Sequence, residues 1–428
     1  MLLTPSKGEN LPTAYGGAIV VGYAKVVKEN VYMRCTHCGA VYDASPRRFF
    51  CEKCGGILEV VVEPPKQVVF RGRGVWRYHS LLPLNTSEPV TLNEGNTPLL
   101  EIKRIAENIS FKGKLYAKYE GANPTGSFKD RGMTVAVTLA REIGVRHAIA
   151  ASTGNTASSA AAYTARAGIK LTLVLPRGKV ALGKLGQSIL HGADIVEIEG
   201  SFDDALKAVI KASTISTSVY PLNSFNAWRL EGQKTIAFEI WEEIGVPDWV
   251  VVPVGNGGNI AAIWKGFKEL REAGLIDSLP RMAGVQASGA APLATAFEKG
   301  LDKPEFVEKP ETIATAIRIG KPINWAKAMK AVRESNGVFV KVTDEEILAA
   351  QHMLARLEGI GAEPAGAASI AGLKKLVEEG VIERGETVVV VVTGHALKDP
   401  DSMMRAPCRR KVASTVDEAV KMVVGGEQ

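Results

Sequence analysis

Short apolar runs alternate with longer stretches of helical periodicity from about residue 90 to residue 393, and this alternation is the strongest constraint on the fold. Such alternation is typical of parallel strands whose connecting helices cover both faces of a sheet. Because so long a region is large for one sheet, we expect two three-layer open-sheet α/β lobes with a cleft between them. The predicted strands are residues 115–120, 147–152, 170–175, 194–199, 249–254, 281–287 and 386–393.

The composition excludes several other classes of protein. Hydrophobic residues make up 46% and charged residues 23%, as in ordinary globular chains. The net charge of +6 is dispersed, which argues against a nucleic-acid groove. No apolar run reaches the ~18 residues of a membrane span. The N-terminus lacks a signal pattern, so we expect a cytoplasmic protein that acts on neither nucleic acid nor membrane.

Four of the five cysteines form two C-x-x-C turns, Cys35 with Cys38 and Cys51 with Cys54. Twelve residues separate the two turns. Four thiolates at this spacing suit a closed tetrahedral zinc site, which would be structural rather than catalytic. Four unliganded buried cysteines, or a redox pair, are the alternatives.

His37 lies inside the first turn, but we do not expect it to be a ligand because four thiolates complete the shell. Gly39 and Gly55 follow the turns and let the backbone bend toward the sulfurs. We therefore divide the chain into residues 1–75, an N-terminal extension with a zinc ribbon at about 31–63, and residues 76–428, which form the two lobes with the active site in their cleft. Residues 1–30 and the tail beyond Pro400 remain unassigned.

The segment Asn123–Gly132, NPTGSFKDRG, follows a predicted strand and leads into a helix beginning near Ser127 or Phe128. Lys129 would stand in the first turn of that helix, where the helix dipole disfavours its charge. We expect Arg131 to disfavour protonation further. Both effects suit an amine nucleophile, although a solvated surface lysine is the alternative.

This segment resembles the Schiff-base lysine motif of the fold type II pyridoxal-phosphate enzymes, the tryptophan synthase β-subunit class. Within that class it is most similar to the threonine synthases. The resemblance covers about residues 75–400, with four motifs in the family's order. It implies that pyridoxal 5′-phosphate is the cofactor and that Lys129 forms the Schiff base.

A second turn, STGNT, joins a predicted strand to an alanine-rich helix, a place where open sheets bind anions. Plain helix capping is the alternative. The turn is similar to the family's S-[ST]-G-N-T motif. The resemblance implies that Asn155 bonds the 3′-oxygen of the cofactor, and that Ser152, Thr153 and Thr156 hold the substrate carboxylate.

A third turn, GNGGN, follows the strand at 249–254 and opens a helix. Its backbone amides could cradle a phosphate, although a bare turn is the alternative. The turn resembles the family's cofactor-phosphate cup. The resemblance assigns that cup to Gly255, Asn256, Gly257, Gly258 and Asn259.

Thr393 ends the last predicted strand and matches the family's hydroxyl partner for the ring nitrogen of the cofactor. A neutral partner leaves the ring a weaker electron sink than a carboxylate would. His395, two residues later, reads as a packed loop residue rather than a base.

The segment from Asn223 to Thr235 resembles the part of threonine synthases that binds the substrate phosphate. The resemblance implies contacts from Asn223, Ser224 and Arg229, and a guanidinium suits a phosphate dianion. An arginine at the start of a surface helix is the alternative. Residues 312–325 also resemble the family, and we expect Arg318 to line the cleft.

The resemblance carried by these four motifs implies a threonine synthase activity, in which O-phospho-L-homoserine and water give L-threonine and phosphate. The alternatives are an O-phosphoserine-dependent cysteine or cysteate synthase, a threonine dehydratase, and a zinc-ribbon binding protein on an inactive enzyme fold. Arg229 argues against the dehydratase, whose substrate carries no phosphate. The family resemblance also implies a homodimer.

Overall fold

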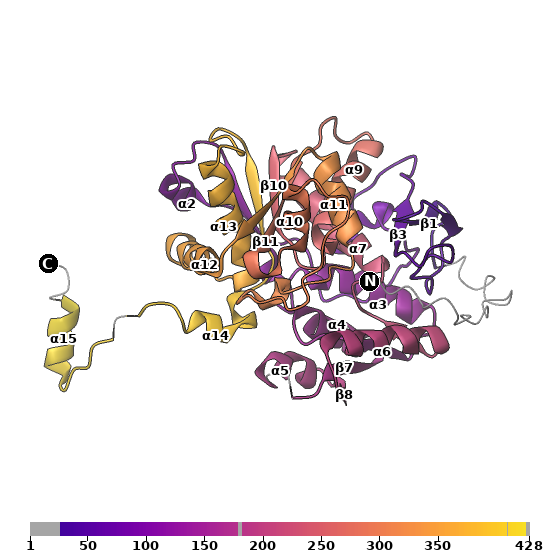
Figure 1. Cartoon of the computed structure of the whole chain (residues 1–428), viewed down its shortest axis with the longest axis horizontal. Helices are drawn as coiled ribbons and strands as arrows, with labels where there is room; N and C mark the ends of the chain where they lie inside the picture. The colour runs from indigo at the N-terminus through magenta and orange to yellow at the C-terminus, as the bar shows by residue number, and fades with distance from the viewer. Residues whose placement is uncertain (1–25, 179–181, 409, 425–428) are drawn as a thin grey trace.

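The computed structural model describes residues 26–178, 182–408 and 410–424, which form two α/β lobes and a small antiparallel sheet beside them (Figure 1). The two lobes confirm the expected fold class. The larger lobe contains six strands, the smaller lobe four, and the N-terminal sheet three.

The larger sheet has the strand order β12-β11-β10-β13-β5-β4, and all its pairs are parallel except β4 with β5. Its strands are β4 (Leu99–Glu101), β5 (Leu115–Tyr119), β10 (Trp249–Pro253), β11 (Arg281–Ala287), β12 (Val338–Val342) and β13 (Val388–Val392). The sequence did not predict β4 and β12; the other four lie where their apolar runs indicated.

The five valines of β13 show how this sheet divides the core of the lobe. All five are completely buried. Because side chains alternate along a strand, Val388, Val390 and Val392 enter one cluster while Val389 and Val391 enter another. The first cluster includes helices α2 (Lys103–Asn108), α12 (Asp344–Glu358) and α13 (Pro364–Glu378). The second includes α8 (Thr235–Ile244), α9 (Gly258–Glu272), α10 (Pro292–Glu298) and α11 (Trp325–Glu334).

The smaller lobe is built from the middle of the chain, between β5 and β10. Its parallel sheet has the order β8-β7-β6-β9. The strands are β6 (His147–Ala150), β7 (Lys170–Pro176), β8 (Asp194–Ile198) and β9 (Val219–Pro221). They share one core with α3 (Lys129–Glu142), α4 (Asn155–Ala167), α5 (Leu182–Leu190) and α6 (Phe202–Ile215). Three residues of β9 are too few for an apolar pattern, and the sequence did not predict this strand.

The N-terminal sheet has the order β2-β1-β3, with β1 (Val31–Cys35) antiparallel to both β2 (Val41–Asp43) and β3 (Leu58–Val62). It lies within the range predicted for the ribbon. Neither helix nor strand occurs between Val62 and the 3₁₀ helix η1 (Val75–Leu81). The predicted division between residues 75 and 76 falls at the start of this 3₁₀ helix and stays a prediction.

The remaining elements are short or peripheral. Helix α7 (Trp228–Gln233) connects the lobes, and η2 (Glu120–Ala122), η3 (Ser288–Ala290), η4 (Thr315–Ile317) and η5 (Ala396–Lys398) are 3₁₀ turns. Helices α14 (Pro400–Met403) and α15 (Val416–Val424) complete the described chain. In the described ranges, no helix has both the length and the apolarity needed to cross a bilayer.

Candidate active site

One pocket gathers most of the residues that the sequence singled out. Lys129 begins α3, Asn155 begins α4, the 255–259 loop follows β10, and Thr393 follows β13. These positions follow the carboxyl ends of parallel strands, where open α/β sheets bind ligands. The pocket is also lined by Phe128, Ser224, Arg229, Leu230, Gln233, Pro253, Ala316, Ile317, Asn324, Glu363 and Ala365.

Lys129 stands at the first position of α3, as predicted, and is partly buried. Its ammonium nitrogen lies 4.2 Å from the centre of the Phe128 ring. Burial and, to a smaller extent, the charge of Arg229 lower the pKa of Lys129 to about 7, while the charge of Glu363 opposes them. Uncharged amine is therefore abundant near neutral pH, as a covalent nucleophile requires.

The expectation that Arg131 depresses the charge of Lys129 is wrong. The guanidinium of Arg131 is completely buried, and it pairs with Glu120 and Glu239, each at 2.7 Å. These two carboxylates neutralise it, so the repulsion on Lys129 comes from Arg229, which lies 100 residues further along the chain. Sequence adjacency could not reveal either pairing.

The turn before Lys129 is fixed by Asp130. Its carboxylate accepts hydrogen bonds from the backbone amide and the hydroxyl of Thr125, both at 2.7 Å, and from Ser159 at 2.6 Å. Ser159 belongs to α4, so this carboxylate ties the lysine turn to the helix that carries Asn155. Asp130 is therefore a structural part of the motif.

Glu363 is a pocket residue that the sequence analysis missed. It is 4% exposed and accepts a hydrogen bond from the side-chain amide of Asn155 at 2.7 Å. Burial raises the pKa of Glu363 to about 7, although the hydrogen bond from Asn155 and the charges of Lys398 and Lys129 oppose the increase. An acidic residue directly before Pro364, the first residue of a helix, was the one available signal.

The three hydroxyl residues of the STGNT turn lie beside Asn155 but do not line the pocket itself. Ser152, Thr153 and Thr156 are partly buried. Within the described chain, no side-chain hydrogen bond is recorded for them, so their hydroxyls are available to a ligand. The carboxylate role inferred for them stays a prediction.

The GNGGN loop has the geometry of an anion cradle. Gly257 has φ +80°, and a Cβ there would lie 2.9 Å from Ala328 and 3.1 Å from the carbonyl oxygen of Asn324. Glycine is therefore required by both conformation and space. The buried side-chain amide of Asn259 has no hydrogen-bond partner in the described residues. An unsatisfied amide at the start of α9 fits a cofactor phosphate bound there.

Arg229 is buried in the pocket without a carboxylate partner in the described residues. It is 2% exposed, its Nη1 donates to the carbonyl of Leu222 at 3.1 Å, and its Nε has no partner. Burial lowers the pKa of Arg229 to about 10. A buried cation is costly unless it is paired, so this guanidinium lacks an anion.

The two other residues predicted to contact the substrate phosphate, Ser224 and Asn223, differ in their position relative to the pocket. Ser224 lines the pocket. Asn223 uses both ends of its side-chain amide on the backbone of Ala151, each at 2.9 Å, and is not among the pocket residues. It therefore fastens this segment to the end of β6, and direct contact with a substrate stays a prediction.

The last strand places Thr393, which is 4% exposed, on the wall of the pocket. His395 accepts a hydrogen bond from the backbone amide of Leu397 at 3.0 Å and so caps a 3₁₀ turn, in line with the packed role expected for it. Arg318 is exposed, and Ala316 and Ile317 line the pocket in its place.

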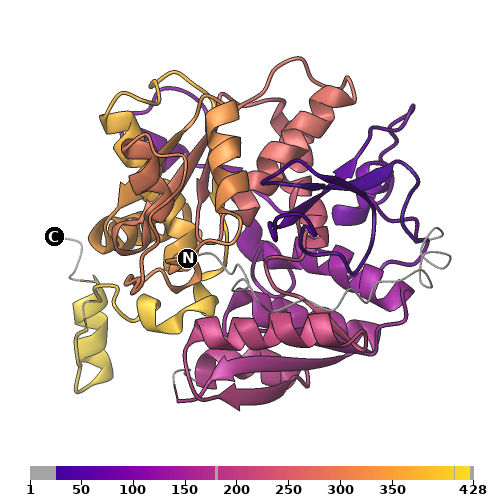
Figure 2. The same cartoon turned by 45° about the vertical axis from the view of Figure 1, so that its right-hand side comes forward.

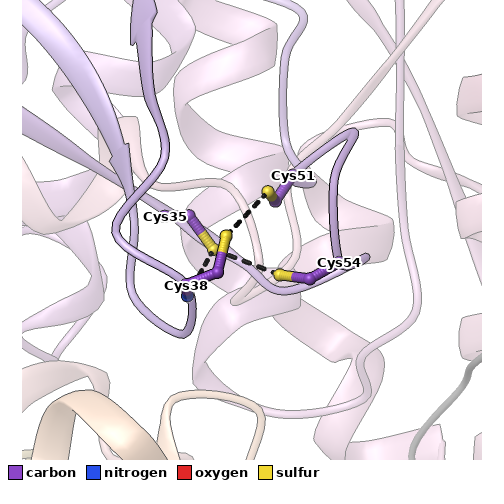
Figure 3. Close-up of side chains that lie close together, drawn as sticks. All are labelled: Cys35, Cys38, Cys51 and Cys54. Carbon is purple, nitrogen blue, oxygen red and sulfur yellow. Dashed lines mark hydrogen bonds between the residues drawn. The ribbon is translucent and has the colours of Figure 1, made fainter.

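The four cysteines of the ribbon converge on one point (Figure 3). Their sulfur atoms all lie within 4.8 Å of one another, with Cys35–Cys54 at 3.5 Å and Cys38–Cys51 at 3.6 Å. Four sulfurs bound tetrahedrally at ~2.3 Å would stand about 3.8 Å apart, so the arrangement fits one zinc ion. His37 is not part of this group.

The glycines that follow the two turns adopt the expected bend. Gly39 and Gly55 have φ of +72° and +69°. Each backbone amide donates to the carbonyl of the first cysteine of its turn, at 3.1 and 2.8 Å. Both glycines therefore confirm the conformational role predicted for them.

Three comparisons relate the chain to known proteins. Residues 90–394 match the family described as pyridoxal-phosphate dependent enzyme. Threonine synthase of Methanosarcina acetivorans is 50% identical over 404 residues, which cover 92% of this chain and 99% of the relative. Threonine synthase of Methanocaldococcus jannaschii is 53% identical, covering 87% and 94%.

Two solved structures share the fold. Threonine deaminase isoform 2 of Solanum lycopersicum superposes with a TM-score of 0.62 at 23% identity, over 77% of this chain and 88% of that chain. Maize serine racemase superposes with a TM-score of 0.61 at 22% identity, over 72% and 90%.

Proposed function

The chain belongs to the pyridoxal-phosphate dependent enzymes and, within them, to the threonine synthases, and on that premise we propose which residues carry out the reaction. The function is the conversion of O-phospho-L-homoserine and water to L-threonine and phosphate. This reaction removes protons from Cα and Cβ, expels phosphate from Cγ and adds water at Cβ. The active site must therefore bind the phosphate of the substrate as well as that of the cofactor. It must also move protons to and from neighbouring carbon atoms of the substrate.

The cofactor site consists of the residues whose backbone or side chains fit its parts. When bound, pyridoxal 5′-phosphate supplies a covalent hold on the substrate amine and an electron sink beside Cα. The Nζ of Lys129 is the attachment point, the 255–259 loop binds the phosphate at the start of α9, and Thr393 meets the ring nitrogen. The unsatisfied amide of Asn259 supports this assignment.

Asn155 is the proposed partner of the 3′-oxygen of the cofactor. Glu363 already holds the amide of this residue, which fixes its orientation before a ligand arrives. The carboxylate of the substrate would accept hydrogen bonds from the hydroxyls of Ser152, Thr153 and Thr156, which lie beside Asn155.

The unpaired guanidinium of Arg229 is the single observation that carries the substrate assignment. It is buried next to Lys129, and it has no carboxylate partner in the described chain, so it needs an anion that the substrate brings. The phosphate of O-phospho-L-homoserine provides two negative charges that match the guanidinium fork. Ser224 lies in the same pocket and can donate its hydroxyl.

Lys129 is the proposed acid and base. With a pKa near 7, its amine can accept a proton from Cα and return one later in the reaction. Burial raises the pKa of Glu363 to about 7, and its charge interacts with that of Lys129, so the protonation states of the two groups are coupled near neutral pH.

The ribbon holds a structural zinc ion in this proposal, bound by Cys35, Cys38, Cys51 and Cys54. The convergence of the four sulfurs supports it. The homodimer and the cytoplasmic location expected from the sequence also stay predictions, which light scattering and cell fractionation would test.

Product analysis tests the proposed function. The purified enzyme, loaded with pyridoxal 5′-phosphate, is incubated separately with O-phospho-L-homoserine, O-phospho-L-serine and L-threonine. We expect threonine and phosphate in equal amounts from the first substrate, and little turnover of the other two. Phosphate release without threonine, or a clear preference for O-phospho-L-serine, would overturn the assignment.

A further inference from the structure

The ribbon packs its apolar face against the helices that carry the two cations of the pocket. One buried cluster joins Met33, Leu58 and Val60 of the ribbon to α3 and α7. In that cluster, α3 contributes Val135 and Leu139, and α7 contributes Trp228, all completely buried. Lys129 begins the first of these helices, and Arg229 directly follows Trp228 in the second.

Two lysines also bind the outer edge of the ribbon sheet. The ammonium of Lys327 donates to the carbonyl of Leu58 at 2.8 Å, and that of Lys265 donates to the carbonyl of Val60 at 2.6 Å. In the described part of the chain, β3 is an edge strand of its sheet, so these alternate carbonyls have no strand partner there, and the lysines satisfy them. Figure 2 shows the N-terminal sheet of the zinc ribbon, in indigo, beside the larger lobe.

The two lysines belong to helices that begin at the phosphate cradle. Lys265 lies on α9, which starts at Gly258, and Lys327 lies on α11, which starts at Trp325. The residue before α11, Asn324, donates its backbone amide to the carbonyl of Asn256 at 2.9 Å. Both helices therefore connect an end of the cradle to the ribbon edge.

The ammonium group of Lys265 also contacts α7, the helix that carries Arg229. Lys265 forms an ion pair with Glu231 of α7, and Glu231 also pairs with Lys234 at 2.6 Å. The side chain of Glu231 is almost fully buried, so its charge is held in one place by these two lysines. One cluster thus joins the ribbon edge, α9 and α7.

We propose that the zinc ribbon is a positioning element of the active site, which acts through Lys265 and Lys327 to set the geometry of the 255–259 loop. Neither lysine touches the pocket, so both are positioning residues. The inference rests on the proposed function, because it assumes that this loop binds the cofactor phosphate.

The test is a titration of the cofactor-free, zinc-loaded full chain with pyridoxal 5′-phosphate, followed by absorbance. We expect Lys265→Met and Lys327→Met to weaken cofactor affinity about 2- to 30-fold, the range typical of coupling through packed elements. Lys265→Arg keeps the donor and should restore most of the affinity. The thermal unfolding midpoint of each variant is measured separately, because a purely structural role would lower that midpoint without changing affinity for the cofactor.

Two lysines on the same helices serve as matched controls. Lys268 of α9 and Lys330 of α11 pair with Glu334 at 2.9 and 3.6 Å, and no recorded hydrogen bond joins either of them to the ribbon. Lys268→Met and Lys330→Met should bind the cofactor as the wild type does. Equal weakening in these controls would overturn the proposal, because it would show a general effect of charge.

Removal of zinc provides a second, independent test of the proposal. Chelation should weaken cofactor affinity in the wild type, yet add little in Lys265→Met or Lys327→Met, because the same link is already broken. Full additivity would contradict the proposal. If one lysine variant fails to fold, the other variant and the chelated wild type decide the question by the same titration.

The failure of this inference is distinguishable from failure of the proposed function. A wild-type chain that does not bind pyridoxal 5′-phosphate removes the proposed function. A wild-type chain that binds it, together with lysine variants and a chelated form that bind it equally well, overturns only the role of the ribbon.

Discussion

The side-chain amide of Asn155, the first residue of α4 in the smaller lobe, donates a hydrogen bond of 2.7 Å to the carboxylate of Glu363, which directly precedes α13 in the larger lobe. This bond crosses the pocket wall beside Lys129. It places a carboxyl group whose pKa is raised to about 7 next to an amine whose pKa is lowered to about 7. The charge state of each group therefore depends on the other.

Replacing Glu363 tests this coupling. Because Lys129 titrates near pH 7, its amine is charged below that pH and uncharged above it, so the rate of cofactor attachment should rise as pH increases through about 7. Glu363→Gln removes a negative charge that favours the protonated amine, so the midpoint should move to lower pH. The midpoint is read from borohydride trapping at each pH, with Lys129 located by peptide mass mapping. An upward shift would contradict the assignment.

Arg229→Met should have the opposite effect on the same midpoint. The variant removes a positive charge that repels the protonated amine, so the pKa of Lys129 should rise. It should also cost about 2–5 kcal/mol of substrate binding, since it removes one partner of a buried charge pair, and this cost should appear mainly in KM.

Arg77→Met is the control for this substitution, because Arg77 pairs with Glu242 at 2.7 Å near the surface. In steady-state kinetics, KM and kcat of Arg77→Met should equal those of the wild type. An unchanged KM in Arg229→Met would exclude Arg229 from binding the substrate phosphate.

The cysteine cluster predicts one zinc ion per chain. Metal analysis of the purified protein should give a stoichiometry near one, and Cys51→Ser should abolish it, because three thiolates leave the shell incomplete. Cys408→Ser is the matched control, since Cys408 is outside the group. A cluster that stays metal-free after purification with added zinc would refute the site.

Helices α3 and α7 approach each other closely at Gly132 and Gly232. A methyl group at either position should destabilise the folded protein. A Cβ on Gly232 would lie 1.6 Å from the carbonyl oxygen of Arg131, so the helices would have to separate. We expect Gly232→Ala to lower the free energy of unfolding by at least about 1–3 kcal/mol, the usual cost of overpacking. Denaturant unfolding measures this change.

Gly186→Ala provides the comparison, because no described atom beyond its chain neighbours and its own helix backbone lies within 4 Å of its Cβ position, and the residue is inside a helix. That substitution should leave stability unchanged or raise it by about 0.5–1 kcal/mol. Equal losses in the two variants would contradict the argument from close approach.

Local motifs could be predicted from the sequence because their chemistry is carried by neighbouring residues. Lys129, the GNGGN loop and the four cysteines each combine turn residues with one functional group, and the structure places each in the expected local setting. The apolar run at residues 386–393 also predicted β13, whose five valines are buried on both faces of the sheet. Short strands such as β4 and β9, three residues each, carry too little pattern to detect.

The interactions that escaped prediction join distant parts of the chain. Arg131 is neutralised by Glu239, and Glu363 meets Asn155 across 208 residues. Which cation acts on Lys129 is therefore decided by tertiary packing. Asn223 illustrates the same limit, since its amide serves the backbone of Ala151.

Strand β13 pairs in parallel with β5, Val388 facing Leu115 and Val392 facing Tyr119. The middle of the larger sheet thus joins an early segment of the chain to one of its last. During synthesis, β5 must wait until residue 392 has left the ribosome before it gains this neighbour, whereas the four strands of the smaller lobe can already associate. Because Thr393 directly follows this strand, the pocket is completed only after residue 393 has been synthesised, and a chain truncated before β13 cannot assemble it.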